Sequence, residues 1–285
     1  MIEGEFESLR AIHGVCPKFV PYAYCWGKFK ESSPSGSETY FLLSDYRHVG
    51  EQPPGPFTFA AYLAKLHKNS KSPTGKFGFH VTTCCAKLPQ PTDCWEESWA
   101  VLYRKQLEQM IKMDLEKHGD WPEFFKICDL VLEKVIPRLL EPLQSEGRSI
   151  KPCLIHGDLW DENTATDMDT GEPFVFGAGS FYAHNEYEIG NWRAARHRLS
   201  DKAYVKNYKQ HFPASEPGQL FSTTWSSLFG YLLTLPIEDE WDARNLLYSL
   251  RFDLGTAILI PGCNQRQEYA PSLPAKPCSM VICPV

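Results

Sequence analysis

The sequence predicts an α+β fold built from a small N-terminal part and a larger, mainly helical C-terminal part. Two runs rich in aromatic and β-branched residues occur early in the chain, and such runs form strands. A Gly- and Pro-rich segment, "RHVGEQPPGP", follows at residues 47–56 and is typical of a boundary between two parts. Beyond it, apolar residues recur every three or four positions, which is the spacing of one helix face.

The N-terminal part covers residues 1–48 and contains one helix and two strands. Residues 3–13 carry apolar side chains three apart, so they predict a short amphipathic helix. Residues 20–26 and 40–43 predict two strands, and the polar loop "KESSPSGSE" joins them. We place the hinge between the two parts near residues 44–50.

The C-terminal part covers residues 49–285 and contains several helices, with two buried strands around a polar loop. Asp120 and Glu123 fit a capping box before one helix, with Pro122 in its first turn. The expected helices cover residues 57–67, 99–111, 124–139 and 242–259, and the expected strands cover residues 153–155 and 174–176.

Composition limits the functions that this chain can have. The 285 residues carry a net charge of −6 at pH 7, whereas a nucleic-acid binder needs clustered Lys and Arg. We therefore expect no nucleic-acid partner. The ten cysteines show no CxxC pair and no zinc-finger spacing, so we expect free thiols in a reducing compartment. The start of the chain lacks the apolar core of a signal peptide, and we expect a cytoplasmic protein.

Residues 218–237 form an uncharged stretch that is long enough to span a membrane. The stretch also holds Ser and Thr residues, two Gly, a Gln and a Pro, which weaken insertion into lipid. We therefore favour a buried helix or an atypical insert, and we expect no membrane partner.

The stretch "HGDLWDEN" carries the chemistry. Asp158 is followed five residues later by Asn163, which is the spacing of kinase catalytic loops. In such a loop the Asp accepts the proton of the attacking hydroxyl and the Asn binds a magnesium ion. We expect Gly157 to allow a tight backbone beside the base and His156 to brace the loop. The alternative is that Asp158 caps a helix which Asn163 ends.

Four separated stretches, "LIHGDLWDEN", "SFYAHNEYEIG", "KFGFHVTTCCAKLPQ" and "CWEESWAVLYRKQL", resemble the fructosamine kinase family. The resemblance covers about residues 4–210 and 241–260. It implies a two-lobed fold similar to that of protein kinases, with an incomplete small lobe here, and it implies ATP and Mg²⁺ as cofactors. It also implies phosphorylation of the sugar 3-hydroxyl of ketosamines on glycated protein amines, the reaction of protein-ribulosamine 3-kinases, which leads to protein deglycation.

The resemblance also implies roles for individual residues in the catalytic loop, 156–163, and after it. By position, Asp158 matches the catalytic base, Trp160 an aromatic residue near the sugar, and Asn163 a metal ligand. His184 and Glu186 match, together with Glu188, the polar cluster of the substrate loop. A pair of surface residues, or a zinc site without a recognisable third ligand, are the alternatives for His184 and Glu186.

The resemblance places the ATP site at the N-terminal part. Glu5 matches the helix glutamate that pairs with the ATP-binding lysine. Ser44, Asp45 and Tyr46 match the hinge whose backbone holds adenine.

The turn "GAGSFY" departs from the family pattern, which has an Asp where Gly177 stands. Glycine has no side chain that could bind a cation, and a catalytic metal contributes several kcal/mol to the transition state. Because about 1.4 kcal/mol is a factor of ten in rate, we expect a loss of several orders of magnitude. Asp167 and Asp169 are poor substitutes on geometry, and Glu186 is the better candidate.

Three further departures concern the ends of the chain and one insert. We expect the phosphate loop and the strand of the ATP-binding lysine upstream of Met1, so Glu5 has no visible partner. The insert at residues 218–237 and the tail at residues 267–285 do not fit the family. We expect all three departures to reflect an imperfect gene model.

The sequence therefore supports three hypotheses. The first is an ATP-dependent ketosamine kinase with slow turnover or none. The second is a non-catalytic binding protein of the same fold. The third is a phosphotransferase for another small hydroxylated molecule, because a fold does not determine a substrate.

Overall fold

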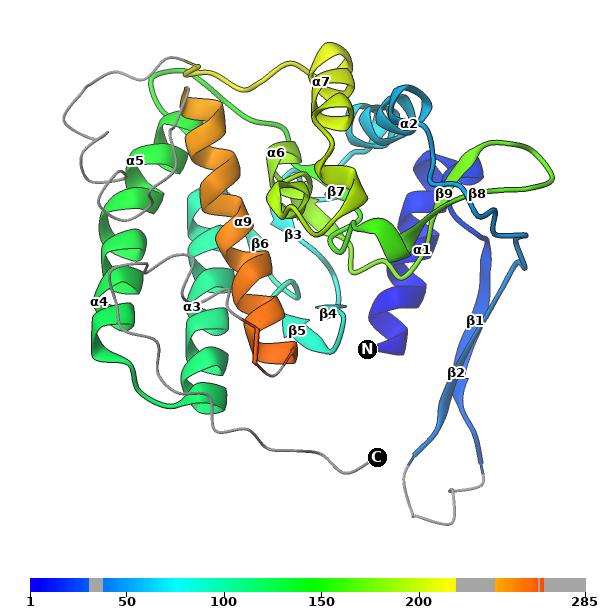
Figure 1. Cartoon of the computed structure of the whole chain (residues 1–285), viewed down its shortest axis with the longest axis horizontal. Coiled ribbons are helices and arrows are strands. Elements are labelled where there is room, and N and C mark those ends of the chain that lie inside the picture. The colour runs from blue at the N-terminus through cyan, green and yellow to red at the C-terminus, as the bar shows by residue number, and fades with distance from the viewer. Residues whose placement is uncertain (31–37, 219–238, 261, 264–285) are drawn as a thin grey trace.

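The N-terminal elements agree with the prediction from the sequence. The computed structural model describes residues 1–30, 38–218, 239–260, 262 and 263. Helix α1 spans Ile2–Val15 and is followed by an antiparallel ribbon of β1, Ala23–Lys28, and β2, Tyr40–Ser44. This ribbon projects away from the helical body (Figure 1). The helix and both strands are confirmed, whereas the division into lobes at residue 48 stays a prediction.

The helices of the larger part form around the predicted apolar stripes. One continuous stripe runs through α4, a π-helical turn at Val131–Val135, and α5. Helix α4 begins one residue later than the predicted capping box places it, at Pro122 with Trp121 rather than Asp120 at the N-cap position. The helices are α2 (Pro56–Asn69), α3 (Trp99–His118), α4 (Pro122–Leu130), α5 (Ile136–Leu140), α6 (Asn185–Glu188), α7 (Lys202–His211) and α9 (Glu240–Leu259).

Short antiparallel strands surround the predicted loop. A four-stranded sheet has the order β6-β3-β10-β7, and β4–β5 and β8–β9 form two separate hairpins. Both strands predicted around the loop exist; β7 pairs with β10, and β9 pairs with β8. The strands are β3 (Phe77–Gly78), β4 (Thr83–Cys85), β5 (Leu88–Gln90), β6 (Trp95–Glu96), β7 (Cys153–Ile155), β8 (Thr164–Thr166), β9 (Pro173–Val175) and β10 (Phe181–Ala183).

An aromatic cluster joins α3, α6 and α9 in the core. Trp99 of α3 lies 5.6 Å from Tyr187 of α6 and 6.0 Å from Tyr248 of α9, between ring centroids. The indole N–H of Trp99 also donates a hydrogen bond of 2.8 Å to the Tyr248 hydroxyl. Aromatic pairs of this kind contribute about 0.5–1.5 kcal/mol each beyond the area they bury. The cluster fixes α9 behind the catalytic loop.

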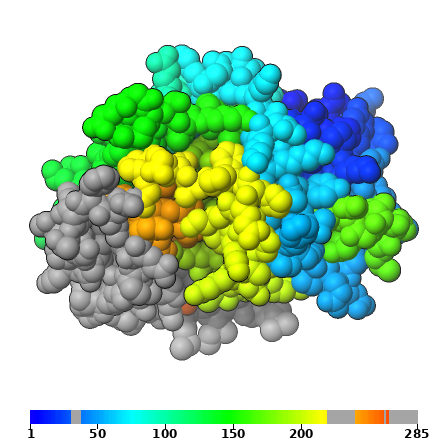
Figure 2. All heavy atoms as spheres, turned by 90° about the horizontal axis from the view of Figure 1, so that it is seen from above, coloured from blue at the N-terminus to red at the C-terminus, as the bar shows by residue number. Residues whose placement is uncertain are grey.

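The segment after β2 contacts the β8–β9 hairpin. Arg47 forms an ion pair of 3.0 Å with Asp167, and Val49 forms a β-bridge with Asp167. Figure 2 shows these N-terminal and hairpin segments gathered at one end of the molecule. Asp167 therefore pairs with Arg47 at the turn between β8 and β9, the turn in which the sequence placed it.

No helix within the described ranges is long and apolar enough to cross a membrane. Residues 219–237 of the uncharged stretch, and the tail at residues 267–285, lie outside the described residues.

Candidate functional site

A cavity of about 590 Å³ opens between α1, the β4–β5 hairpin, the catalytic loop and the C-terminal end of α9. Its size suits a small organic ligand, since ligand pockets usually enclose about 300–1,000 Å³. Five of the predicted residues line it: Glu5, Asp158, Trp160, Asn163 and Gly177. These residues come from three parts of the sequence, which the fold brings together around one cavity.

Asp158 lies at the floor of this cavity, with 8% of its surface exposed. Its Oδ1 accepts a hydrogen bond of 3.1 Å from the Cys85 thiol, and its Oδ2 accepts one of 3.1 Å from the Ala86 backbone N–H. Arg251 of α9 is buried nearby, and its positive charge acts on both Cys85 and Asp158. A buried carboxylate needs such donors and a compensating charge. Asp158 is therefore held in one position.

Glu188 of α6 braces the loop from behind. Its carboxylate accepts hydrogen bonds from the backbone N–H groups of His156 and Gly157, the latter at 3.0 Å. His156 Nε2 lies 2.9 Å from the Phe176 carbonyl, and burial lowers the pKa of His156, so a neutral imidazole donates this bond. His156 thus braces the loop, as predicted.

Gly157 has the conformation that the tight loop requires. Its φ is +84°, and a Cβ added there would lie 2.1 Å from the Gly179 carbonyl oxygen. Only glycine fits such an approach without a backbone shift. The loop and the turn after β9 are therefore in direct contact.

The corner at Gly177 does not fit a magnesium ion as it is arranged. Asn163 donates from Nδ2 to the Asp158 carbonyl at 2.7 Å, and its Oδ1 lies 2.7 Å from the point where a Cβ of residue 177 would stand. The amide of Asn163 therefore fills space next to the missing carboxylate. Within the described part of the chain, no group of three or more His, Cys, Asp or Glu side chains could hold a metal ion.

Trp160 and His197 form the wall beside Asp158. Trp160 is half-buried, and its ring centroid lies 5.7 Å from that of His197 in an edge-on arrangement. Burial lowers the pKa of His197, so the ring is neutral near pH 7. Asp161 accepts backbone hydrogen bonds from Arg198 and Leu199 at 2.6 and 3.0 Å. Aromatic side chains beside a few polar groups are the usual lining of a small-molecule pocket.

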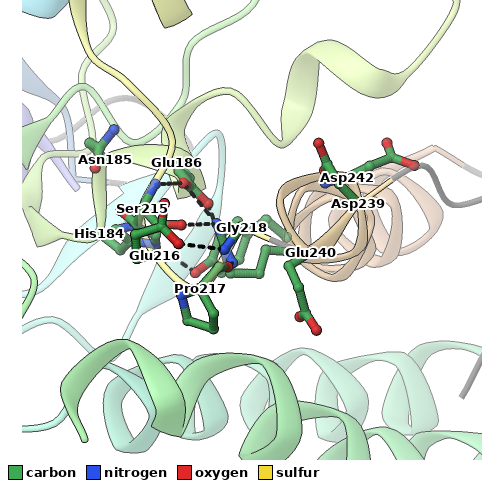
Figure 3. A network of polar contacts seen from close by, with 12 residues as sticks. His184, Asn185, Glu186, Ser215, Glu216, Pro217, Gly218, Asp239, Glu240 and Asp242 are labelled. Atoms are coloured by element: carbon green, nitrogen blue, oxygen red, sulfur yellow. Dashed lines mark hydrogen bonds and ion pairs between the residues drawn. The ribbon is translucent and has the colours of Figure 1, made fainter. Parts of the chain in front are cut away.

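His184 and Glu186, predicted in the substrate loop, lie outside this cavity in a buried network (Figure 3). Glu186 pairs with Arg244 of α9 at 2.7 Å and accepts the backbone N–H of Ser215 at 2.8 Å. His184 bonds through its two ring nitrogens to the Tyr248 hydroxyl and the Ser215 hydroxyl. The surface-pair and zinc alternatives find no support within the described residues, and Glu186 is engaged with Arg244 rather than directed at Asn163.

The charges of this network shift its pKa values. Burial alone would raise the pKa of Glu186, but His184 and Arg244 beside it hold that pKa below its usual value. Burial lowers the pKa of His184 to about 4. The network therefore contains a neutral imidazole beside a compensated ion pair at pH 7.

Of the four residues expected at the ATP site, one lines the cavity and three do not. Glu5 lines the cavity, and burial raises its pKa. Ser44, Asp45 and Tyr46 do not line it. Asp45 accepts hydrogen bonds from the Tyr24 hydroxyl at 2.7 Å and the Tyr22 backbone N–H at 3.2 Å, which tie it to β1. Their hinge role stays a prediction.

Sequence reasoning missed three residues around Asp158, namely Cys85, Ala86 and Arg251. Cys85 and Ala86 belong to a stretch that supported the resemblance, but nothing in the sequence showed which residue they face. Ala86 has a φ of +50°, which is uncommon for a non-glycine residue. Arg251 is a cation on the same helix face as the apolar Leu247, Leu254 and Ile258, and such a residue is buried only when it has a partner. That interruption of the stripe was the available signal.

The fructosamine kinase family model matches residues 1–219. The chain belongs to this family. It is 39% identical over 212 residues to the ketosamine-3-kinase of Mus musculus. This alignment covers 66% of the present chain and 63% of the mouse protein. It is 32% identical over 196 residues to the chloroplastic protein-ribulosamine 3-kinase of Oryza sativa subsp. indica, covering 68% of this chain and 53% of that protein.

A solved structure from Thermobifida fusca YX-ER1, described provisionally as a fructosamine-3-kinase, aligns with a TM-score of 0.68 at 18% identity over 95% of this chain and 78% of that chain. This likeness confirms the predicted kinase-like α+β fold. The chain spans about half of the length of the rice relative and less than two thirds of the mouse relative.

Proposed function

We propose that this chain is a phosphotransferase of the ribulosamine/fructosamine 3-kinase type, acting on the sugar 3-hydroxyl of ketosamines on protein amines, with turnover slowed at Gly177. The observation that carries the proposal is the Asp158 carboxylate, held by two donors on the floor of a cavity with Trp160 in its wall. Family membership supports the substrate class, because the mouse and rice relatives are named for ketosamines and ribulosamines. Such an activity would contribute to protein deglycation.

In this proposal Asp158 orients the 3-hydroxyl and accepts its proton as the oxygen attacks phosphorus. Each carboxylate oxygen has a second lone pair that the donors of the hairpin leave free. Trp160 offers the sugar an apolar face, and only 8% of the surface of Asp158 is exposed to solvent. Positioning of this kind contributes most of the catalysis in phosphoryl transfer.

ATP, when bound, would supply the phosphoryl group. Within the described lining, Glu5 is the residue that belongs to the expected nucleotide side, and the cationic side chains are those of Arg196 and Arg198 rather than of a lysine.

The described cysteines are free thiols, which supports a reducing compartment such as the cytoplasm.

A second candidate is ketosamine or nucleotide binding without turnover. It is favoured by the position of the Asn163 amide, whose Oδ1 fills the corner where a metal-binding carboxylate would begin. This candidate uses the same cavity and differs only in the absence of the chemical step.

The experiment is calorimetry of ATP binding, with and without Mg²⁺, on the parent chain and on Gly177→Asp. Residue 177 has a φ of +66°, which Asp and Asn tolerate better than other side chains. Gly177→Asn is therefore the matched control, with the same backbone demand and no charge. Phosphorylation of a ribulosamine, followed by ³¹P NMR, is the second readout.

Two outcomes separate the candidates. If Gly177→Asp binds Mg-ATP and phosphorylates the ribulosamine at least about 100-fold faster than the parent and Gly177→Asn, the phosphotransferase proposal holds. If all three proteins bind a ribulosamine and none phosphorylates it, the proposal fails and the binding role replaces it.

A further inference from the structure

The tip of the β4–β5 hairpin touches Asp158 with two consecutive residues. Cys85 donates from Sγ to Oδ1 at 3.1 Å, and Ala86 donates from its backbone N–H to Oδ2 at 3.1 Å. The two residues lie 73 and 72 positions before Asp158 in the sequence. One protein donor therefore holds each oxygen, so the plane of the carboxylate is fixed.

The thiol remains protonated, as a donor must be. Burial is the main cause that raises the pKa of Cys85 to about 12, and the negative charge of Asp158 adds to it, against an opposing effect of Arg251. A neutral thiol next to a carboxylate donates its proton in the hydrogen bond. Cys85 is consequently neither a nucleophile nor a metal ligand at pH 7.

The hairpin is fixed firmly enough to hold another residue in place. Thr83 Oγ1 and Gln90 Nε2 both donate to the Gly179 carbonyl, at 3.2 and 3.0 Å. Arg251 donates from Nη2 to Gln90 Oε1 at 2.8 Å, which ties the hairpin to α9. Ala86 is the first residue of the two-residue turn between β4 and β5, where its positive φ of +50° is the conformation that such a turn requires. For a non-glycine residue this conformation is strained, and such strain persists only where the surroundings fix the backbone.

We propose that Cys85, with the Ala86 N–H, is a positioning residue that orients the Asp158 carboxylate for the substrate hydroxyl. This inference rests on the proposed function, in which Asp158 accepts the hydroxyl proton. Other charged and titratable groups near Asp158 are Arg251 from α9, Tyr187 from α6, and His156 and His197 from the adjoining loops. Cys85 is the side chain among the described residues that is hydrogen-bonded to the carboxylate itself.

The first test is infrared spectroscopy of the S–H stretch, which lies where other protein groups do not absorb. The difference between the parent chain and Cys85→Ala isolates the Cys85 band. Cys153 provides the matched reference, because it is also a buried thiol whose pKa burial raises to about 12, but no carboxylate is among the causes of its shift. We expect the Cys85 band at lower wavenumber than the Cys153 band, and we expect Asp158→Asn to move it upward. Equal bands that Asp158→Asn leaves unchanged would overturn the inference.

The second test measures kcat and KM in the Gly177→Asp background. Cys85→Ala removes the donor, and we expect kcat to fall about tenfold with KM unchanged, which is the effect of one hydrogen bond to a charged group. Cys85→Ser keeps a donor of similar size and should retain most of kcat. Equal losses in both variants would mean that Cys85 acts only through packing. If Gly177→Asp does not turn over at all, the proposed function fails, while the infrared result still decides the contact.

Discussion

His184 makes the stability of this protein depend on pH in a window that can be calculated. Its side chain is fully buried and bonded to Tyr248 and Ser215, and burial lowers its pKa from 6.5 to about 4. Between these values the unfolded chain binds a proton that the folded chain does not, so stability falls as pH falls from 6.5 towards 4. From pH 7 to pH 5, the free energy of unfolding should decrease by about 2 kcal/mol through this residue alone.

The measurement is urea unfolding, followed by tryptophan fluorescence, at pH 7 and pH 5. His184→Gln is the comparison, because it removes the titrating group and keeps an amide that can bond to Ser215 or Tyr248. The variant loses stability at both pH values, but its decrease between them should be smaller than that of the parent by about 2 kcal/mol. His156 and His197 titrate in both proteins and cancel. Equal decreases in parent and variant would refute the calculated window.

Three further predictions concern residues that hold the site together. Arg244→Met leaves Glu186 as a buried unpaired charge and should lower the free energy of unfolding by about 3–5 kcal/mol, and the double variant with Glu186→Gln should recover part of this loss in urea unfolding. Ala86→Gly relieves a φ of +50° and should raise the thermal midpoint, since strain of this kind costs about 1–2 kcal/mol; an unchanged midpoint would contradict the assigned strain. Glu188→Gln weakens the brace on Gly157, so the amide of Gly157 should exchange with deuterium faster than in the parent, at an unchanged rate in α3.

Elements with a long hydrophobic pattern could be predicted, whereas of the short strands in the larger part only β7 and β9, the apolar runs on either side of the catalytic loop, could be. Helices α2, α3 and α9 each repeat the apolar period several times, so their existence and position were clear from the sequence. Strands β3 and β10 have two and three residues, too few to show alternation. Their pairing, Tyr182 with Gly78, joins residues about a hundred positions apart. Such pairing depends on tertiary packing, which a local pattern does not contain.

The residues of the site also fall into those that the sequence could predict and those that it could not. Asp158, Trp160 and Asn163 lie within one loop, so their spacing alone predicted them to lie together. The sequence could not show that His184 lies outside the cavity. Its position depends on the chain turn at α6, and a helix of four residues is too short to leave a recognisable pattern. The sequence placed Glu186 near a metal, whereas its contact with Arg244, 58 positions away, directs it into the core. Charged residues close in sequence to a site can thus serve the packing behind it.

The two halves of the site depend on different contacts, and this determines what a single substitution can restore. Asp158 is held by Cys85, Ala86 and the loop that Glu188 braces, and none of these contacts involves residue 177. The missing carboxylate therefore leaves the base in place and changes only the corner that Asn163 fills. An amide side chain can rotate, whereas a displaced loop would need the hairpin to move, so Gly177→Asp requires Asn163 to rotate and to give up its hydrogen bond to the Asp158 carbonyl. A gain of activity in that variant would thus show that the base was already positioned, whereas the absence of turnover would overturn the proposed function.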